Sequence, residues 1–170
     1  MSDDPSPQAP CEEAFPPASP EAFLRLCAGE WMNLRSLFQL GEGAVGENGD
    51  EWHSSERSEL LVSYLETAES GGPGGLSVGA RAGAMRQLLF SADGSFHSQE
   101  AGAGGAGRWQ FWPDGSLELV VADAGVEVRE RIWFTKPNLR LRSTVERRDD
   151  GSPGRASFSS EIRRVSRPAA

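Results

Sequence analysis

The sequence predicts an all-β fold: a closed, antiparallel up-and-down barrel of about ten strands, preceded by one short helix. Short segments with alternating apolar and polar residues recur from residue 31 to residue 165. Turn signals such as Asp93-Gly94 and Asp114-Gly115 separate these segments, as antiparallel hairpins require. The 170 residues also include 20 glycines and 11 prolines, which oppose long helices. We expect the sheet to close because closure removes exposed strand edges.

The helix is predicted from its end signals. Ser19 is a typical N-cap, Pro20 suits the first helical position, and Glu21 complements the positive end of the helix dipole. Gly29 ends the segment after about two turns, which is too short for a helix that is stable by itself. We therefore expect the helix to pack on the barrel.

The first strand begins at Trp31, and alternation places Met32 and Leu34 on one face and Asn33 and Arg35 on the other. Further strands are predicted at residues 58–66, 77–84, 86–91, 95–99, 107–112, 117–122, 126–134, 139–147 and 156–165. Glycine-rich turns are expected at 41–50, 71–75 and 149–154. The Ala/Gly run at 101–107 is interpreted as a flexible loop, since no helix start follows it.

One hairpin carries charges within a strand-forming run, R-E-R-I-W-F-T-K-P-N-L-R-L-R-S-T at residues 129–144. Its strands are residues 130–134 and 139–145, with a turn at 136–138. Alternation gives three sets of residues that share a face: Arg140, Arg142 and Thr144; Leu139, Leu141 and Val145; and Glu130, Ile132 and Phe134. Taken alone, arginines on a strand are more often solvated surface residues than cavity residues.

Composition predicts one domain with two tails: a disordered tail at residues 1–18, a barrel domain at 19–165 and a C-terminal tail at 166–170. The formal net charge of −8 opposes non-specific binding to nucleic acid and to anionic membranes. No apolar run approaches the roughly 20 residues that span a bilayer, so we expect a cytoplasmic protein.

The cysteines and histidines do not predict a disulfide or a metal site. Cys11 falls in the predicted tail and Cys27 in the helix, and neither has a histidine nearby to suggest a nucleophile. His53 and His97 have no carboxylate or cysteine at ligand spacing. We therefore expect no metal site.

Three motifs in this sequence resemble a known family. They are E-R-I-W-F-x-x-P-N-L-R-L-R at 130–142, A-S-F-S-S-E-I-R at 156–163, and G-E-W-M-N-L-R at 29–35. Together they resemble the S-type phycobiliprotein lyases, the CpeS/CpcS family, over about residues 23–164, most closely in the C-terminal third. The resemblance implies a barrel of the lipocalin and fatty-acid-binding type.

The resemblance also implies an enzyme. Lyases of this family bind a phycobilin, an open-chain tetrapyrrole such as phycocyanobilin or phycoerythrobilin, as substrate. They attach it through a thioether to a cysteine of an apo-phycobiliprotein subunit of phycocyanin, allophycocyanin or phycoerythrin. No cofactor is implied, and the attacking thiol belongs to the acceptor protein.

Carried over residue by residue, the resemblance gives a candidate site. Glu130 and Arg140 are its candidate catalytic residues, with Glu130 stabilising or supplying the proton that makes the ethylidene carbon of the A ring electrophilic. Arg35, Arg140 and Arg142 are expected to hold propionates, because guanidinium pairs with carboxylate through two hydrogen bonds. Thr144 is expected to orient a propionate or a ring carbonyl. Glu161 is a further ligand-binding candidate on a strand predicted to be half-exposed, together with Ser157 and Ser159.

The sequence departs from the family at one wall. Family members commonly carry a tryptophan after G-A-R-V-S, whereas this chain has Gly79-Ala80-Arg81-Ala82-Gly83-Ala84. The departure leaves two alternatives open beside the lyase: a non-catalytic bilin carrier, and a stabilising subunit of a heterodimeric lyase. A homodimer or a heterodimer with a related lyase is also possible.

Overall fold

The computed structural model describes residues 14–39, 53–67, 70–100 and 103–166. The predicted turn at 41–50, most of the predicted N-terminal tail and nearly all of the C-terminal tail lie outside these ranges. Residues 14–18 are described, although the prediction assigns them to the tail. Pro17 is buried there, and Pro16 and Pro17 lie beside Gly115 in a turn of the barrel. The tail prediction therefore extends too far toward the helix, because these prolines pack on the barrel.

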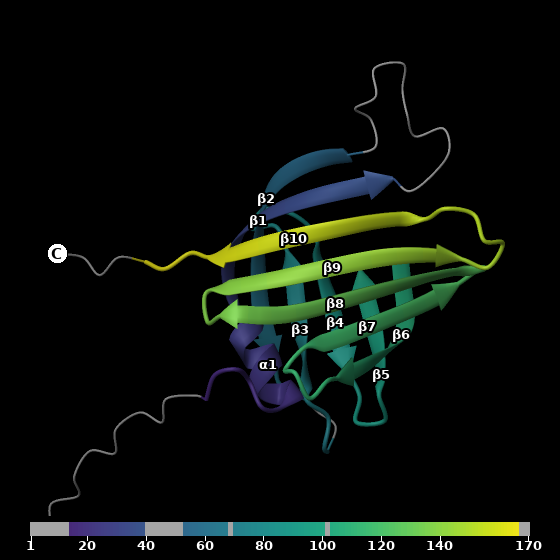
Figure 1. Ribbon diagram of the computed structural model, residues 1–170. Helices are drawn as coiled ribbons and strands as arrows, with labels where there is room; N and C mark the ends of the chain where they lie inside the picture. Colours follow the sequence, from purple (N-terminus) through teal and green to yellow (C-terminus); the bar gives the residue numbers. More distant parts are fainter. Residues whose placement is uncertain (1–13, 40–52, 68–69, 101–102, 167–170) are drawn as a thin grey trace, which may run out of the picture.

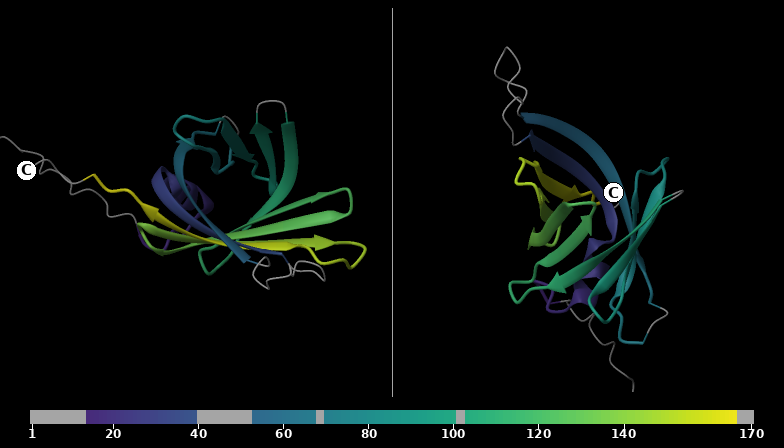
Figure 2. Two further views of the ribbon diagram at one scale, coloured as in Figure 1. Left: turned by 90° about the horizontal axis from the view of Figure 1, so that it is seen from above. Right: turned by 90° about the vertical axis from the view of Figure 1, so that its right-hand side faces the viewer.

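Ten antiparallel strands close into a barrel, as predicted (Figures 1 and 2). The strands are β1 (Gly29–Gln39), β2 (His53–Leu65), β3 (Gly74–Gly79), β4 (Met85–Phe90), β5 (Ser95–Glu100), β6 (Ala103–Phe111), β7 (Leu117–Asp123), β8 (Val126–Lys136), β9 (Leu139–Arg148) and β10 (Arg155–Arg163). Every strand pairs with its neighbours in sequence, and β1 closes the ring against β10. The predicted hairpin at 129–144 is the β8–β9 pair. Its turn consists of residues 137–138, one residue fewer than the predicted 136–138, because Lys136 belongs to β8.

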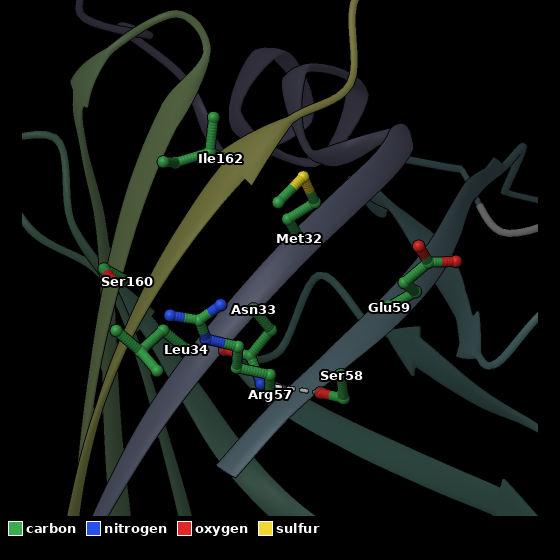
Figure 3. Close-up of a pocket in the computed structure, with 8 residues that line it drawn as sticks. All are labelled: Met32, Asn33, Leu34, Arg57, Ser58, Glu59, Ser160 and Ile162. Carbon is green, nitrogen blue, oxygen red and sulfur yellow. Dashed lines mark hydrogen bonds between the residues drawn. The ribbon is translucent and has the colours of Figure 1, made fainter. Parts of the chain in front are cut away.

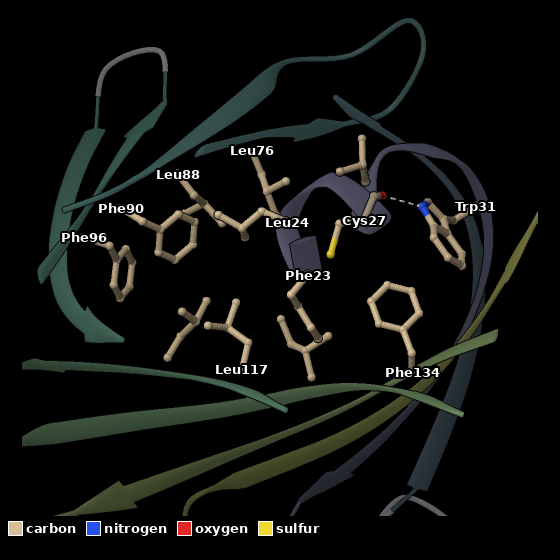
Figure 4. Packing of buried hydrophobic residues seen from close by; sticks show 13 residues of the cluster. Phe23, Leu24, Cys27, Trp31, Leu76, Leu88, Phe90, Phe96, Leu117 and Phe134 are labelled. Atoms are coloured by element: carbon tan, nitrogen blue, oxygen red, sulfur yellow. Dashed lines mark hydrogen bonds between the residues drawn. The ribbon is translucent and has the colours of Figure 1, made fainter. Parts of the chain in front are cut away.

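The single helix, α1 (Pro20–Cys27), begins and ends as predicted. The Ser19 side chain accepts a hydrogen bond from the Ala22 amide at 3.1 Å, so the N-cap is formed. Three residues of α1, Phe23, Leu24 and Cys27, are buried against the barrel interior (Figure 4). The helix therefore gains its stability from tertiary packing, as its length requires.

The barrel interior is apolar near the helix. Rings from the helix and three strands meet there. Phe23 is in edge contact with Phe134, and Trp31 lies next to Phe134 (Figure 4). Phe23 is also in edge contact with Phe111. Further from the helix, the inward positions of β8, β9 and β10 become polar: Glu130, Arg142 and Ser159 follow the more deeply placed Phe134, Arg140 and Glu161. The fold therefore separates a packed apolar end from a polar end.

Several predicted strand boundaries differ from the structure: β2, for example, begins at His53 rather than at residue 58, and two further differences lie at glycines. The predicted strand at 77–84 is β3, which begins at Gly74 and ends at Gly79, so 74–75 belong to the strand and 80–83 to the turn. The predicted loop at 101–107 contains the start of β6 at Ala103. Gly107 pairs with Phe96, and a Cβ atom there would lie 2.6 Å from the Phe96 ring. The glycine permits this close approach of two strands. In the sequence the same glycine is easily mistaken for a loop signal.

Among the described residues, no helix is long and apolar enough to cross a lipid bilayer.

Candidate functional site

The polar end of the barrel contains a cavity of about 460 Å³. Its walls come from β1–β5, from Ala84 in the β3–β4 turn and from β8–β10, and are mainly polar. The lining residues are Asn33, Arg35, Glu56, Ser58, Leu60, Val78, Gly79, Ala84, Arg86, Glu100, Glu130, Arg142, Thr144, Ser157, Ser159 and Glu161. This interior cavity is the candidate site, because it gathers charged groups inside a barrel that can enclose a small ligand.

A chain of charged side chains crosses the wall formed by β8, β9 and β10. Arg140 Nε donates to Glu161 Oε2, and both residues are only 1% exposed. The other Glu161 oxygen lies 3.3 Å from a terminal nitrogen of Arg142. Arg142 in turn reaches Glu130 at 3.4 Å. Thr144 Oγ1 donates to Glu130 at 3.5 Å, so hydrogen bonds and ion pairs link five side chains in one network.

The strand register explains this network. Arg140 pairs with Glu161 across β9 and β10, and Thr144 pairs with Glu130 across β9 and β8. Residues two apart on a strand share a face, so Arg140, Arg142 and Thr144 all point inward. The surface interpretation of these arginines is therefore wrong, because their face of the hairpin lines the barrel interior.

The Trp31 side chain forms a floor below this network. Its Nε1 donates to the Cys27 carbonyl at 2.9 Å, which satisfies a carbonyl at the end of α1. The Arg140 guanidinium lies 4.5 Å from the Trp31 ring centroid, and the Arg163 guanidinium lies 4.3 Å from it. Arg163 also donates to the carbonyls of Leu26 and Ala28. The helix end and the polar network are thus joined through one indole ring.

Burial and neighbouring charges shift the pKa values of two groups near Trp31, the Arg142 guanidinium and the Cys27 thiol. Burial opposes the charged form of Arg142, but Glu130 and Glu161 outweigh it and raise the pKa of the guanidinium. Arg142 therefore stays cationic. Burial also raises the pKa of the Cys27 thiol, although Arg140 opposes this effect. A buried, protonated thiol is a poor nucleophile, which agrees with the prediction that Cys27 carries no chemistry.

The structure brings most of the predicted site residues together. Arg35, Glu130, Arg142, Thr144 and Glu161 line the same cavity. Their roles toward a ligand stay predictions. Arg140 is placed differently: it lies at the buried base of the network and is not among the lining residues. Its Nε donates to Glu161, and its role toward a propionate stays a prediction.

The half-exposed placement predicted for β10 is wrong. Ser157 and Ser159 are buried, and Glu161 is nearly inaccessible. The reason is the inward face of β10, where Glu161 pairs with Arg140 on one side and Asn33 on the other. Alternation in A-S-F-S-S-E-I-R places these residues on one face, but the sequence alone does not say which face turns inward.

The sequence analysis missed the wall formed by β2–β5. Arg86 and Glu100 line the interior cavity there, and so does Ser58, which accepts a hydrogen bond from the Asn33 side chain at 3.0 Å. Arg86 stands two positions before the buried Leu88 on β4, so the same face turns inward. That alternation was a usable signal for Arg86.

A second chamber of about 310 Å³ adjoins the interior cavity. Arg86 and Glu130 line both spaces, which makes them the boundary between the two. The second chamber is otherwise mainly apolar, with walls from Phe96, Leu119 and Val121 among others. Together the two spaces offer an elongated volume with one polar and one apolar part.

A groove of about 470 Å³ also lies on the outside of the barrel, over β1, β2 and β10 (Figure 3). Its apolar side chains are Met32, Leu34 and Ile162, which are 52%, 43% and 55% exposed. These residues point outward from β1 and β10, and their neighbours on the same strands point inward and line the interior cavity. The groove carries no concentration of charged groups comparable to the cavity and is not a candidate for chemistry.

The described residues contain no group of three or more His, Cys, Asp or Glu side chains that could hold a metal ion. The side chains of the cavity supply carboxylates that exchange protons and guanidinium groups that bind anions. Two guanidinium nitrogens, Arg140 Nη2 and Arg142 Nε, are buried without a hydrogen-bond partner among the described residues. Because Arg142 lines the cavity, its Nε is suited to an acceptor atom of a ligand.

Comparison with known proteins identifies the relatives of this chain. The family described as CpeS-like protein matches residues 99–164. "Chromophore lyase CpcS/CpeS 1" of Paulinella chromatophora is 43% identical over 159 residues, which are 93% of this chain and 96% of the relative. "Chromophore lyase CpcS/CpeS" of Thermosynechococcus vestitus is 45% identical over 65 residues, 38% of this chain and 35% of the relative.

A solved structure supports the fold. The S-type phycobiliprotein lyase CPES from Guillardia theta aligns with a TM-score of 0.57 and 17% identity over 86% of this chain and 93% of that one. The shared fold is the lipocalin-like barrel predicted from the sequence. With a full-length relative at 43% identity, this chain belongs to the CpcS/CpeS family of chromophore lyases.

Proposed function

We propose that this protein binds an open-chain tetrapyrrole in the interior cavity and attaches it to a cysteine of an apo-phycobiliprotein subunit. The observation that carries the proposal is the cavity-lining Arg142, whose Nε is buried without a hydrogen-bond partner among the described residues. Unpaired buried donors are costly, and an acceptor group on a ligand removes that cost. Carboxylate and carbonyl oxygens of a bilin are such acceptors.

The shape of the site supports the same ligand class. The two adjoining spaces of about 460 and 310 Å³ suit an extended molecule rather than a compact one. The apolar chamber accommodates pyrrole rings, while the polar cavity receives charged substituents. An open-chain tetrapyrrole with two propionates combines both features.

In the proposed reaction, the acceptor thiol adds across the ethylidene double bond of the A ring. A sulfur–carbon bond forms at the ethylidene carbon, the double bond becomes a single bond, and the thiol proton is balanced by a proton gained on the ring. Glu130 is proposed to carry this proton, accepting it from the thiol and delivering it to the ring, since its carboxylate lies at the boundary of the two spaces and contacts Arg142 and Thr144. The remaining contribution is positioning, because a bilin held in one conformer presents one carbon and one face to the thiol.

The test is a reconstitution. The purified protein is incubated with phycocyanobilin or phycoerythrobilin and with apo-subunits of phycocyanin, allophycocyanin and phycoerythrin. We expect a covalent adduct on one acceptor cysteine, seen as zinc-enhanced fluorescence after denaturing electrophoresis and lost when that cysteine is replaced by alanine. Acceptors that stay unlabelled, with a related lyase subunit also supplied, would contradict the proposal.

The same assay separates the two alternatives. Tight bilin binding without transfer to any acceptor indicates a carrier. Transfer only in the presence of a second, co-eluting lyase indicates a stabilising subunit. Ala84 favours the stabilising subunit, because it lines the cavity at the position where relatives are expected to carry tryptophan.

A further inference from the structure

Arg86 differs from the other arginines that line the interior cavity. Arg35 lies 3.5 Å from Glu56, and Arg142 contacts both Glu130 and Glu161. Within the part of the chain that the structure describes, Arg86 makes no ion pair with a carboxylate, although it lines the same cavity. Arg86 is therefore a lining arginine whose guanidinium donors are not taken by a carboxylate of the described residues.

The position of Arg86 in the barrel is fixed by strand alternation. On β4, Arg86, Leu88 and Phe90 share the inward face, and the last two are buried in the core. Arg86 is the outermost of the three and pairs with Val78, which also lines the cavity. The arginine is thus exposed toward the cavity, while its strand is anchored by apolar packing below it.

The barrel topology places Arg86 across from the buried network. β4 is the fifth strand from β9 in either direction around the ring of ten, through β8–β5 or through β10, β1, β2 and β3. Arg142 on β9 and Arg86 on β4 therefore stand on opposite walls. Arg86 also borders the second chamber together with Glu130, so a ligand that extends through both spaces passes between these two side chains.

We propose that Arg86 binds a carboxylate of the ligand from the wall opposite Arg142, so that a ligand with two carboxylates is held from both sides of the barrel. The proposal rests on the proposed function and adds a second anchoring wall to it. The propionates of an open-chain tetrapyrrole sit on its two central rings, so they can project toward opposite walls when the molecule is extended. A free guanidinium is suited to this role because it pairs with a carboxylate through two hydrogen bonds.

Glu100 is the local competitor for Arg86. It lies on the neighbouring strand β5 and lines the same cavity, yet no oxygen of it comes within ion-pair distance of Arg86. Its charge disfavours a ligand carboxylate nearby. We therefore expect Glu100→Gln to tighten the binding of a dicarboxylic bilin, and weaker binding by this variant would contradict the arrangement.

The decisive experiment compares phycocyanobilin with its dimethyl ester, in which both carboxylates are neutral. Dissociation constants are measured by absorption titration for the wild type, Arg86→Gln, Arg86→Lys and Arg57→Gln. Arg57 is the matched control, since it is an exposed arginine of β2 that lines the outer groove and not the cavity. Melting curves confirm that each variant is folded.

We expect Arg86→Gln to weaken binding of the free acid about tenfold or more, as the loss of a charge-assisted hydrogen bond predicts. The same variant should bind the dimethyl ester as the wild type does, Arg86→Lys should retain part of the free-acid affinity, and Arg57→Gln should change neither. Unchanged free-acid binding, or equal weakening for acid and ester, overturns the role of Arg86 while the proposed function stands. A wild type that binds no bilin overturns both.

Discussion

Arg140 and Glu161 form an ion pair on neighbouring strands, and each residue is only 1% exposed to solvent. Their register partners on either side are Phe134 on β8 and Asn33 on β1. The pair therefore separates the apolar end of the barrel from the polar cavity. Because Glu161 also contacts Arg142, the pair fixes the orientation of a cavity-lining guanidinium from below.

Removal of one partner should be strongly destabilising. Arg140→Ala leaves Glu161 buried with only Arg142 as a countercharge, and it removes the cation that lies against the Trp31 ring. We expect a loss of about 3–5 kcal/mol in the free energy of unfolding, measured by urea denaturation. The control is the double variant Arg140→Met, Glu161→Leu, which removes both charges and should recover most of the loss. A single variant that costs less than about 1 kcal/mol would show that the pair is not buried in solution.

Glu130 and Arg142 should separate transfer from binding. Glu130→Gln keeps the size of the side chain and its contact with Thr144 but removes the carboxylate that accepts and returns the proton, so bilin transfer should slow by about 10²–10⁴-fold. Its dissociation constant for bilin should stay within about threefold of the wild type. Arg142→Gln should instead weaken binding. Single-turnover transfer at saturating bilin, beside absorption titrations, measures both quantities, and equal loss of binding in the two variants would refute this division.

The site was predicted best where its residues lie close together in the sequence, on one hairpin. Alternation along one hairpin placed Arg142 and Thr144 on one face, and the register then brought Thr144 opposite Glu130. The pairing of Arg140 with Glu161 could not be predicted from the sequence, because it joins residues 21 positions apart through a strand register that sequence patterns do not determine. The face that turns inward follows only from closure of the whole barrel.

The wall formed by β3–β6 was predicted least well. Its glycines read as loop signals, although Gly107 belongs to β6, where it fits the Phe96 ring. Alternation with Leu88 indicates that Arg86 can face inward, but it does not distinguish a cavity-lining arginine from an exposed one at the end of a short strand. Whether Arg86 is available to bind a ligand depends on which arginines are already paired with carboxylates, and only the folded structure shows that pairing.

The small side chain at Ala84 should determine how the cavity surrounds a bilin. Ala84→Trp adds an indole at a lining position of the β3–β4 turn. Stacking on a pyrrole ring is worth about 0.5–1.5 kcal/mol, so we expect roughly two- to tenfold tighter binding with a shifted absorption maximum of the bound bilin. Ala82→Trp, in the same turn but outside the cavity lining, is the control. An identical response of the two variants would mean that position 84 does not contact the ligand.

Two glycines of β6 should respond differently to an added methyl group. In Gly107→Ala the Cβ atom would lie 2.5 Å from the Val120 carbonyl oxygen and 2.6 Å from the Phe96 ring. We expect a loss of about 1–3 kcal/mol, as in other overpacked sites. In Gly104→Ala the nearest atom is 3.7 Å away, so the substitution should be neutral or slightly stabilising. Thermal and urea denaturation of both variants test this contrast, and equal stabilities would contradict the packing of Gly107.

Acid should weaken the barrel through its Asp-Gly-Ser turns. At Asp114, hydrogen bonds from the Ser116 hydroxyl and amide, with Arg131 nearby, hold the pKa of the carboxyl below its ordinary value of 3.8. Asp93 and Asp150 are held below that value in the same way by Ser95 and Ser152. Because the folded-state pKa is lowered, the stabilisation is present above pH 3.8 and is lost as the pH falls through the folded-state value.

The measurement is urea denaturation of the wild type and Asp114→Asn between pH 7 and pH 2.5. The amide cannot ionise, so the variant should be less stable than the wild type at pH 7, and the difference should shrink as the pH falls below 3.8. Asp123→Asn is the control, since Asp123 is an exposed carboxylate that makes no ion pair or hydrogen bond through its side chain among the described residues. A difference between wild type and Asp114→Asn that stays constant down to pH 2.5 would show that the carboxylate charge does not stabilise this turn.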